Sequence, residues 1–271
     1  MLRELLKHNI RMSVPEDINE VALLFSGGTD SLSLFYSCID LGIKTNLYTY
    51  CLEGFESEDL KVAKKIEEKY GINLTVCYIE NNIEKLIEDV FHLLGMRISG
   101  KVNIQCMHGH MYVAPKIKEQ YCLNGSGIDG IYGTYKEYFM GESKTNKEVF
   151  DQLRIKHLNN PNDDAMQYQY DLYKSFGIET LYPYRQPNVI DYLMKLSWSE
   201  INKPKFKNIC VQDFPEIIND GLYRQRGSQQ IISGTREFHD KLLNTKYNTK
   251  NYKRVGSVYK QMNKLINMIR L

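Results

Sequence analysis

Short apolar runs alternate with longer amphipathic stretches through the first half of the sequence. The apolar runs are rich in β-branched and aromatic residues and predict four strands, at 21–25, 45–51, 73–79 and 121–124. The stretches around them carry apolar residues at three- and four-residue spacing and predict helices, at 2–13, 32–42, 57–71, 82–95 and 109–119. Strands that alternate with helices indicate an α/β fold, in which a parallel twisted sheet is covered by helices on both faces.

The pattern changes near residue 141, beyond which strand signals fade and helical patterns dominate. Polar residues fill 141–165, where we expect a mobile loop around 159–164. We therefore divide the chain into an α/β core, residues 1–140, and a mainly helical part of the same domain, residues 141–271. A length of 271 residues is compatible with one large domain of this kind.

The C-terminal tail, residues 241–271, holds eight Lys and Arg residues and no acidic residue. Its last helix carries one apolar stripe, made of Val255, Tyr259, Met262, Ile266 and Ile269. The stripe predicts a helix that docks on the protein and keeps its basic face in solvent. Contact of that face with a phosphate-bearing partner such as tRNA or DNA is the less favoured alternative.

A glycine turn, Ser26-Gly27-Gly28-Thr29-Asp30-Ser31, joins the first predicted strand to the next helix. The free backbone amides of a helix N-terminus bind anions, and glycines let the backbone approach an anion closely. Ser26 and Ser31 add hydroxyl donors. Asp30 would repel a phosphate unless a cation lay between them, so the turn points to a phosphate held together with Mg²⁺. The common phosphate loop has a Lys after its glycines, and this turn has none.

A second glycine segment, residues 124–135, follows the fourth predicted strand. It contains Gly125, Gly127 and Asp129. Ligands of a parallel sheet bind beyond the carboxyl ends of its strands, which is where both glycine-rich stretches fall. If the two stretches line one cleft, Asp30 and Asp129 can hold Mg²⁺ between them, because this cation prefers oxygen ligands.

Composition and charge bear on the partners and the cellular location of the protein. The net charge of +2 gives no overall basic footprint for nucleic acid, and no apolar run approaches the ~18 residues that span a bilayer. The N-terminal stretch contains no apolar signal-peptide segment, so we expect a cytoplasmic protein with no membrane partner. The six cysteines include no C-x-x-C pair, which argues against a zinc ribbon or a redox pair.

A C-x-H-x-H cluster is formed by Cys106, His108 and His110. A structural zinc site would need a fourth ligand, and the alternate spacing suits a strand better than a helix. We therefore expect these residues in a loop beside the substrate pocket, and we do not favour a metal site there.

The two glycine-rich stretches together resemble a known family. Residues 26–31 are similar to the S-G-G-x-D-S pyrophosphate loop of the ATP pyrophosphatases. Residues 124–135 resemble the S-G-E-G-A-D-E-L-F-G-G-Y segment of asparagine synthetases and β-lactam synthetases. Weaker similarities follow in the family's order, at 50–63, 177–184, 188–196, 207–215 and 223–226.

The resemblance implies a fold like that of the adenine nucleotide alpha hydrolases and a ligase that uses ATP and Mg²⁺. Such an enzyme adenylates a carboxylate, releases pyrophosphate and transfers the acyl group to ammonia or an amine. Motif positions would place nucleotide-binding residues at Ser26, Gly27, Gly28, Asp30, Ser31, Leu52, Gly125 and Gly127. Asp30 and Asp129 would hold Mg²⁺, Glu179 would lie near the acceptor site, and Arg226 would supply a catalytic cation.

Several acceptor-side positions depart from the family pattern. Arg226 stands where Lys is usual, Gln186 where Asp is usual, and Gly130 where Glu is usual. We expect no glutamine-hydrolysing domain in this chain, so the nitrogen would come as free ammonia, as an amine, or from a separate amidotransferase subunit. We therefore expect retained adenylation with a different acceptor or nucleophile.

Two alternatives to the amide ligase stay open. One is a related enzyme that modifies a nucleobase, tRNA or DNA, and the other is a catalytically silent nucleotide-binding subunit.

Overall fold

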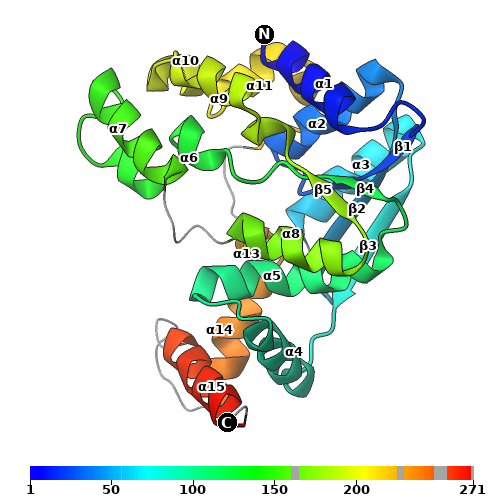
Figure 1. Cartoon of the computed structure of the whole chain (residues 1–271), viewed down its shortest axis with the longest axis vertical. Coiled ribbons are helices and arrows are strands. Elements are labelled where there is room, and N and C mark those ends of the chain that lie inside the picture. Colours follow the sequence, from blue (N-terminus) through cyan, green and yellow to red (C-terminus); the bar gives the residue numbers. More distant parts are fainter. Residues whose placement is uncertain (56, 160–164, 225–228, 247–254, 270–271) are drawn as a thin grey trace.

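A computed structural model describes residues 1–55, 57–159, 165–224, 229–246 and 255–269 of the chain (Figure 1). Its centre is a five-stranded sheet in which every neighbouring pair of strands is parallel, in the order β3-β2-β1-β4-β5. The strands are β1 (Glu20–Leu24), β2 (Lys44–Leu52), β3 (Leu74–Ile79), β4 (Tyr121–Leu123) and β5 (Glu179–Leu181). All carboxyl ends therefore lie along one edge of the sheet.

Side chains of the strands alternate between two hydrophobic cores, one on each face of the sheet. In β1, Val21 and Leu23 belong to the first core, while Ala22 and Leu24 belong to the second. Because helices cover both faces, the strands are apolar along most of their length, which is why they were recognisable as apolar runs.

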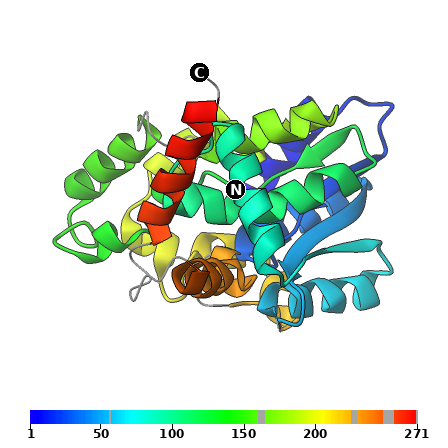
Figure 2. The same ribbon diagram turned by 90° about the horizontal axis from the view of Figure 1, so that it is seen from below.

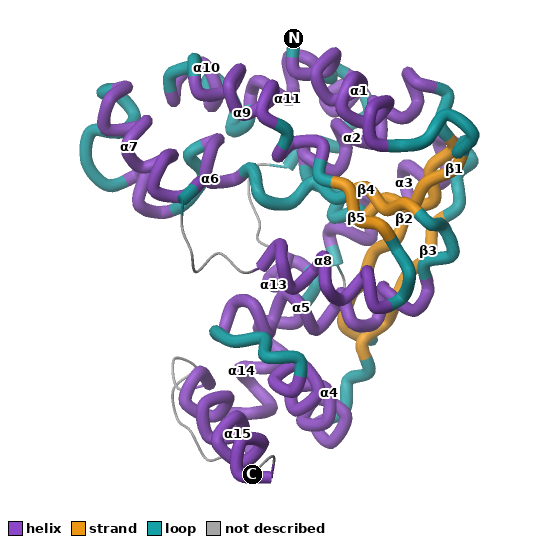
Figure 3. Tube along the Cα trace, viewed as in Figure 1, coloured by secondary structure: helices purple, strands orange, loops and turns teal. Residues whose placement is uncertain are grey.

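The helices that line the first core come from both halves of the chain. They are α1 (Leu2–Ser13), α2 (Thr29–Leu41), α3 (Glu58–Tyr70), α6 (Asp129–Tyr132), α7 (Lys147–Leu158), α9 (Pro187–Met194), α10 (Trp198–Asn202), α11 (Asn208–Asp213) and α12 (Glu216–Asn219). In Figure 3, α1, α2 and α9 to α11 form the upper group of helices.

The second core is lined by helices that form the lower group in Figure 3. They are α4 (Ile83–Gly95), α5 (Lys101–Val113), α8 (Ala165–Ser175), α14 (Thr235–Lys246) and α15 (Val255–Ile269). Figure 2 looks onto this group, with α15 (red) in front. A short helix, α13 (Gln229–Ile232), precedes α14, and 3-10 turns occur at Ala114–Lys116, Lys136–Phe139 and Pro183–Arg185.

The predicted strands and most predicted helices of the first half are confirmed within a few residues. The helix after the glycine turn ends where Gly42 takes a φ of 69°, and the helix after it is capped by Ser57 and ends at Gly71 with a φ of 62°. Glycine adopts this left-handed conformation readily, so both helix ends were marked in the sequence.

The helix predicted at 109–119 is wrong in its position. Helix α5 spans Lys101–Val113, so the C-x-H-x-H cluster lies on a helix and not in a loop. Its polar residues Gln105, His108 and His110 are buried together with Ile104 and Met107. The helix is buried on several sides and has no single apolar stripe. Apolar spacing therefore could not show where the helix begins.

The second half of the chain contributes to the sheet as well as to the helices. Strand β5 pairs in parallel with β4 and was not predicted, because three residues are too short to show an alternating pattern. Helix α7 lies within the polar stretch 141–165 and ends just before the loop that we expected around 159–164. Residues 160–164 of that expected loop lie outside the described residues. The division of the chain at residue 140 stays a prediction.

The docked helix predicted in the tail is confirmed. Val255, Val258, Tyr259 and Met262 of α15 are buried in the second core, where the helix packs against α4 and α14. Lys260 and Lys264 are exposed on its other side. Within the described residues no helix combines the length and the apolar character needed to cross a bilayer.

Candidate active site

The connections of the sheet change direction between β1 and β4. The chain leaves β1 for β2 on one side and leaves β4 for β5 on the other. At such a switch point the loops beyond the strands diverge and leave a crevice for a ligand. The glycine turn follows β1 and the second glycine segment follows β4. A Cβ added to Gly125 would lie 3.2 Å from the Cβ of Asp30, so the two segments meet at this switch point, and we refer to their meeting place as the crevice.

The glycine turn is shaped to bind an anion. Gly28 is the N-cap of α2, so the amides of residues 29–31 have no acceptor within the helix. The Ser31 hydroxyl donates to the Gly28 carbonyl at 3.1 Å, and the Ser26 and Ser31 Oγ atoms are 3.4 Å apart. Free amides and two hydroxyls at the positive end of a helix favour a phosphate group.

A close contact with helix α3 explains the first glycine of the turn. Gly27 has a φ of +61°, and a Cβ built there would lie 2.8 Å from the Cβ of Val62. Any larger residue would strain the backbone and displace the turn from α3.

Asp30 and Asp129 both pair with one lysine, which lies between them. The Lys207 Nζ is 2.6 Å from Asp30 Oδ2 and 2.8 Å from Asp129 Oδ1. Lys207 is the N-cap of α11. Lys207 opens the segment 207–215 that resembles the family, but we assigned it no role from the sequence, in which it lies 177 residues beyond Asp30.

Burial and neighbouring charges shift the pKa values of Asp30, Asp129 and Lys207. Burial raises the pKa of Asp30 to about 6, although the nearby Lys207 ammonium opposes this shift. Burial also raises the pKa of Asp129, but Lys207 and the Thr134 hydroxyl outweigh it, so this carboxyl titrates below its usual range. Burial lowers the pKa of Lys207, but the two carboxylates raise it well above its ordinary value, so the amine is charged.

The carboxylate pair fits a divalent cation. Asp30 Oδ1 is buried and has no hydrogen-bond partner among the described residues. A buried acceptor of this kind is costly unless something binds it. Two carboxylates that converge beside an anion-binding turn are the oxygen ligands that Mg²⁺ prefers. Asp30 and Asp129 would hold that cation once the Lys207 ammonium had moved aside.

Arg224 is a site residue that the sequence analysis missed. Its Nη2 donates to the carbonyl oxygen of Ser26 at 2.7 Å and forms an ion pair with Asp59. Asp59 is buried at the start of α3, where burial raises its pKa to about 6 against the effect of Arg224. Arg224 therefore joins the glycine turn to α3. The segment 223–226 was noted only for Arg226, which lies outside the described residues.

The second glycine segment is held by buried side chains. The Asn124 Oδ1 accepts from the Ser126 amide at 2.9 Å, and its Nδ2 donates to Gln169 Oε1 at 2.9 Å. Gln169 lies 3.0 Å from His110 Nε2. Burial lowers the pKa of His110 to about 4, so the ring is neutral near pH 7. This network fixes the segment that carries Asp129.

Leu52 lies at the carboxyl end of β2, but its backbone is already engaged. Its amide donates to the Ser233 carbonyl at 2.9 Å, and its carbonyl accepts from the Phe55 amide at 3.0 Å. The structure therefore offers no free amide at Leu52 for an adenine ring, and a base would have to displace Ser233 to use it.

Glu179 is not brought to the crevice. It is the exposed first residue of β5, paired in register with Tyr121 at the start of β4. Since all strands are parallel, the amino ends lie at the edge of the sheet opposite the glycine turn. This placement gives no support to the role beside the acceptor that its motif position implied.

His108 and His110 of the C-x-H-x-H cluster are buried, and Cys106 is half-buried. The His108 Nε2 is 3.0 Å from Asp89 Oδ2, and its Nδ1 is 2.9 Å from His239 Nε2. The His239 Nδ1 lies 2.6 Å from the Tyr259 hydroxyl. The described residues contain no group of three or more His, Cys, Asp or Glu side chains that could hold a metal ion.

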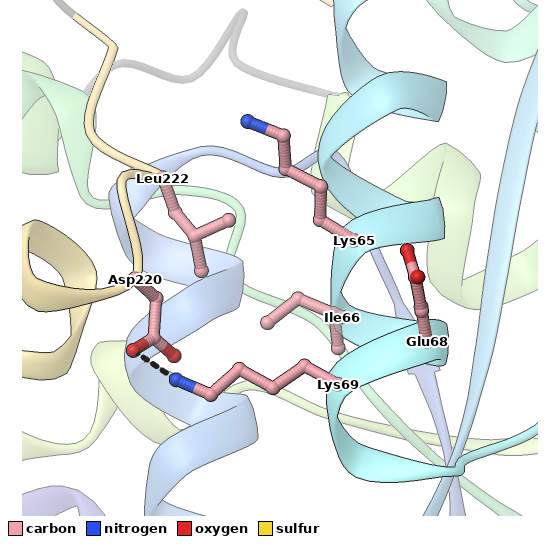
Figure 4. Close-up of a pocket in the computed structure, with 6 residues that line it drawn as sticks. All are labelled: Lys65, Ile66, Glu68, Lys69, Asp220 and Leu222. Atoms are coloured by element: carbon pink, nitrogen blue, oxygen red, sulfur yellow. Dashed lines mark hydrogen bonds and ion pairs between the residues drawn. The ribbon is translucent and has the colours of Figure 1, made fainter.

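A separate hollow of about 360 Å³ lies between α3 and the segment that follows α12 (Figure 4). Lys65, Lys69, Asp220 and Leu222 are among the residues that line it. The Lys69 ammonium is already paired with Asp220, which also accepts from the hydroxyls of Tyr36 and Tyr70. No residue of either glycine segment lines this hollow, so it is distinct from the crevice.

A parallel sheet with an anion-binding turn and paired carboxylates at its switch point defines a nucleotide-binding α/β protein. The family model described as asparagine synthase matches residues 1–175. The chain belongs to the asparagine synthase family, which consists of ATP pyrophosphatase-type enzymes.

No curated protein sequence matches the chain. Among solved structures it is similar to the U34-tRNA thiolase NcsA from Methanococcus maripaludis, at 14% identity over 97% of this chain and 78% of that one, with a TM-score of 0.40. It is also similar to a predicted subunit of tRNA methyltransferase from Methanocaldococcus jannaschii, at 17% identity over 65% of this chain and 75% of that one, with a TM-score of 0.32. Likeness at this level says nothing about the substrate.

Proposed function

We propose that the protein is an ATP-dependent, AMP-forming amide ligase. It would adenylate a small-molecule carboxylate and transfer the acyl group to ammonia or an amine. The observation that carries this proposal is the meeting of Asp30, Asp129 and the glycine turn at the switch point of the sheet. Family membership supplies the class of reaction.

The residues of the crevice have roles in the first half-reaction. The amides of residues 29–31 and the Ser26 and Ser31 hydroxyls bind the β- and γ-phosphates, which leave as pyrophosphate. The substrate carboxylate forms a bond to the α-phosphorus as the bond from that atom to the bridging oxygen breaks. Mg²⁺ held by Asp30 and Asp129 would neutralise the phosphate charge that repels this carboxylate. Lys207 and Arg224 place two further positive charges beside the turn.

In the second half-reaction a nitrogen nucleophile attacks the acyl adenylate, loses a proton and displaces AMP. We assign neither Glu179, which lies away from the crevice, nor Arg226, which is outside the described residues, to this step. A separate amidotransferase subunit remains one possible source of ammonia.

An acyl-trapping assay tests the proposal. The protein is incubated with ATP, Mg²⁺, hydroxylamine and a panel of carboxylic acids, and hydroxamate and AMP are quantified. We expect one class of acid to give hydroxamate and AMP in equal amounts, and Asp30→Asn to abolish both. Formation of ADP, or no hydroxamate with any acid, would contradict the proposal.

A second candidate function follows from the basic C-terminal tail. Its eight Lys and Arg residues, of which Lys260 and Lys264 are exposed on α15, would suit a tRNA or DNA substrate. Under this alternative the same crevice would activate a nucleobase. AMP formation that depends on added tRNA or DNA, and not on any acid, would favour it over the amide ligase.

A further inference from the structure

Backbone contacts of Lys207, as well as its ion pairs, hold the residue in place. Its backbone takes a φ of 53°, a left-handed conformation that is unfavourable for a residue with a side chain. Its amide donates to Asn202 Oδ1 at 3.2 Å, and Asn202 Nδ2 donates to the Tyr132 carbonyl at 2.7 Å. These contacts direct the side chain of Lys207 over the ring of Tyr132 and into the crevice.

The ammonium group of Lys207 and a divalent cation compete for the same oxygens. Asp30 Oδ2 and Asp129 Oδ1 both lie within 2.8 Å of the Lys207 nitrogen, a distance that leaves no room for a second cation between them. One ammonium also cancels one of the two carboxylate charges. A metal ion that approached the nucleotide-free protein would meet an occupied position and a weaker negative field.

We propose that Lys207 occupies the metal position of the nucleotide-free protein and moves to the phosphates when ATP and Mg²⁺ enter. This inference rests on the proposed function. The amides of residues 29–31 place a bound phosphate chain next to Asp30, within reach of a lysine with four rotatable side-chain bonds. The phosphates give Lys207 new acceptors, so nucleotide binding frees the carboxylates. Metal binding therefore depends on the nucleotide, and the two ligands are positively coupled.

Mn²⁺ binding without nucleotide tests this inference directly. Mn²⁺ replaces Mg²⁺, and the free ion is counted by its electron paramagnetic resonance signal. We expect the wild-type protein to bind Mn²⁺ no more tightly than Asp30→Asn does. Lys207→Met keeps the length of the stem and removes the charge, and should gain one site per chain with at least tenfold tighter binding. Adding Asp30→Asn to Lys207→Met should remove that site again.

Lys205→Met is the matched control, because Lys205 lies two residues away with its ammonium over the ring of Tyr223. It should bind Mn²⁺ as the wild type does. Tight stoichiometric Mn²⁺ binding by the nucleotide-free wild type would overturn the inference, and this measurement needs no variant. The hydroxamate assay tests the proposed function separately, because it does not measure metal binding in the absence of ATP. The two proposals can therefore fail independently.

Discussion

At the scale of single residues, Gly27 joins the glycine turn to the fold around it. A Cβ at this position would lie 2.8 Å from Val62 of α3, and the positive φ adds backbone strain. Gly42 has a similar φ, +69°, but a Cβ there would meet nothing within 4 Å. The two glycines therefore separate the effect of conformation from the effect of packing.

We expect Gly42→Ala to destabilise the protein by about 1 kcal/mol through backbone strain alone. Gly27→Ala should cost about 1–3 kcal/mol more, because Val62 must be displaced. Val62→Ala in the Gly27→Ala background should recover part of that difference. Urea unfolding of the four proteins measures these effects, and equal losses at the two glycines would show that the contact with α3 is unimportant.

The residues that could be predicted from the sequence are those with a local signature. Asp30 and Asp129 each follow a buried strand within a glycine-rich segment, so their place at one edge of the sheet could be inferred. Lys207 and Arg224 follow no buried strand and fall only within the weaker family similarities at 207–215 and 223–226. They reach the glycine turn only because α11 and the segment after α12 fold back over it, and this depends on the packing of the whole first core.

At the scale of elements, helix α5 shows how a buried polar network positions the site. Gly109, in the second half of the helix, lets the ring of Tyr50 lie against it, since a Cβ there would be 2.1 Å from the ring. His110 then reaches Gln169 of α8, which in turn holds Asn124, the first residue of the second glycine segment. The same burial of polar residues obscured the helix in the sequence.

The neutral His110 predicts an acid-sensitive fold. Its pKa of about 4 lies below its ordinary value of 6.5 because of burial, so the unfolded chain binds more protons between these limits. Stability from this residue is therefore present above pH 6.5 and is lost as the pH falls toward 4. Between pH 7 and pH 5 we expect a loss of about 2 kcal/mol from His110.

Urea unfolding of the wild type and His110→Gln at both pH values isolates this contribution. The variant should lose about 2 kcal/mol less than the wild type on acidification. His92→Gln, an exposed change on α4, should follow the wild type. An identical pH dependence in His110→Gln and the wild type would show that the buried ring does not control the acid response.

At the scale of the whole molecule, one sheet separates two cores, and both cores draw on the second half of the chain. The α/β plan could be predicted because strands buried on both faces are continuously apolar. Strand β5 and the placement of α11 could not, because one is too short for a pattern and the other depends on distant contacts. The basic tail is tied to the second core through α15.

This arrangement predicts that α15 contributes to global stability. Met262 is buried at 1% exposure, so Met262→Ala should cost about 2–4 kcal/mol and shift a single cooperative transition. Lys264→Ala, on the exposed side of the same helix, should change stability by less than about 0.5 kcal/mol. Differential scanning calorimetry compares the two. A Met262→Ala transition that matches the wild type would mean that α15 is not part of the folding unit.

The proposed function requires that the crevice between the two glycine segments cleaves ATP between its α- and β-phosphates. The most direct measurement follows α-labelled ATP with Mg²⁺ and the acid panel, for the wild type, Asp30→Asn and the exposed control Asp191→Asn. We predict labelled AMP with equimolar pyrophosphate from the wild type and the control, and a loss of at least about 100-fold in Asp30→Asn. Labelled ADP from the wild type, or unchanged AMP formation in Asp30→Asn, would contradict it.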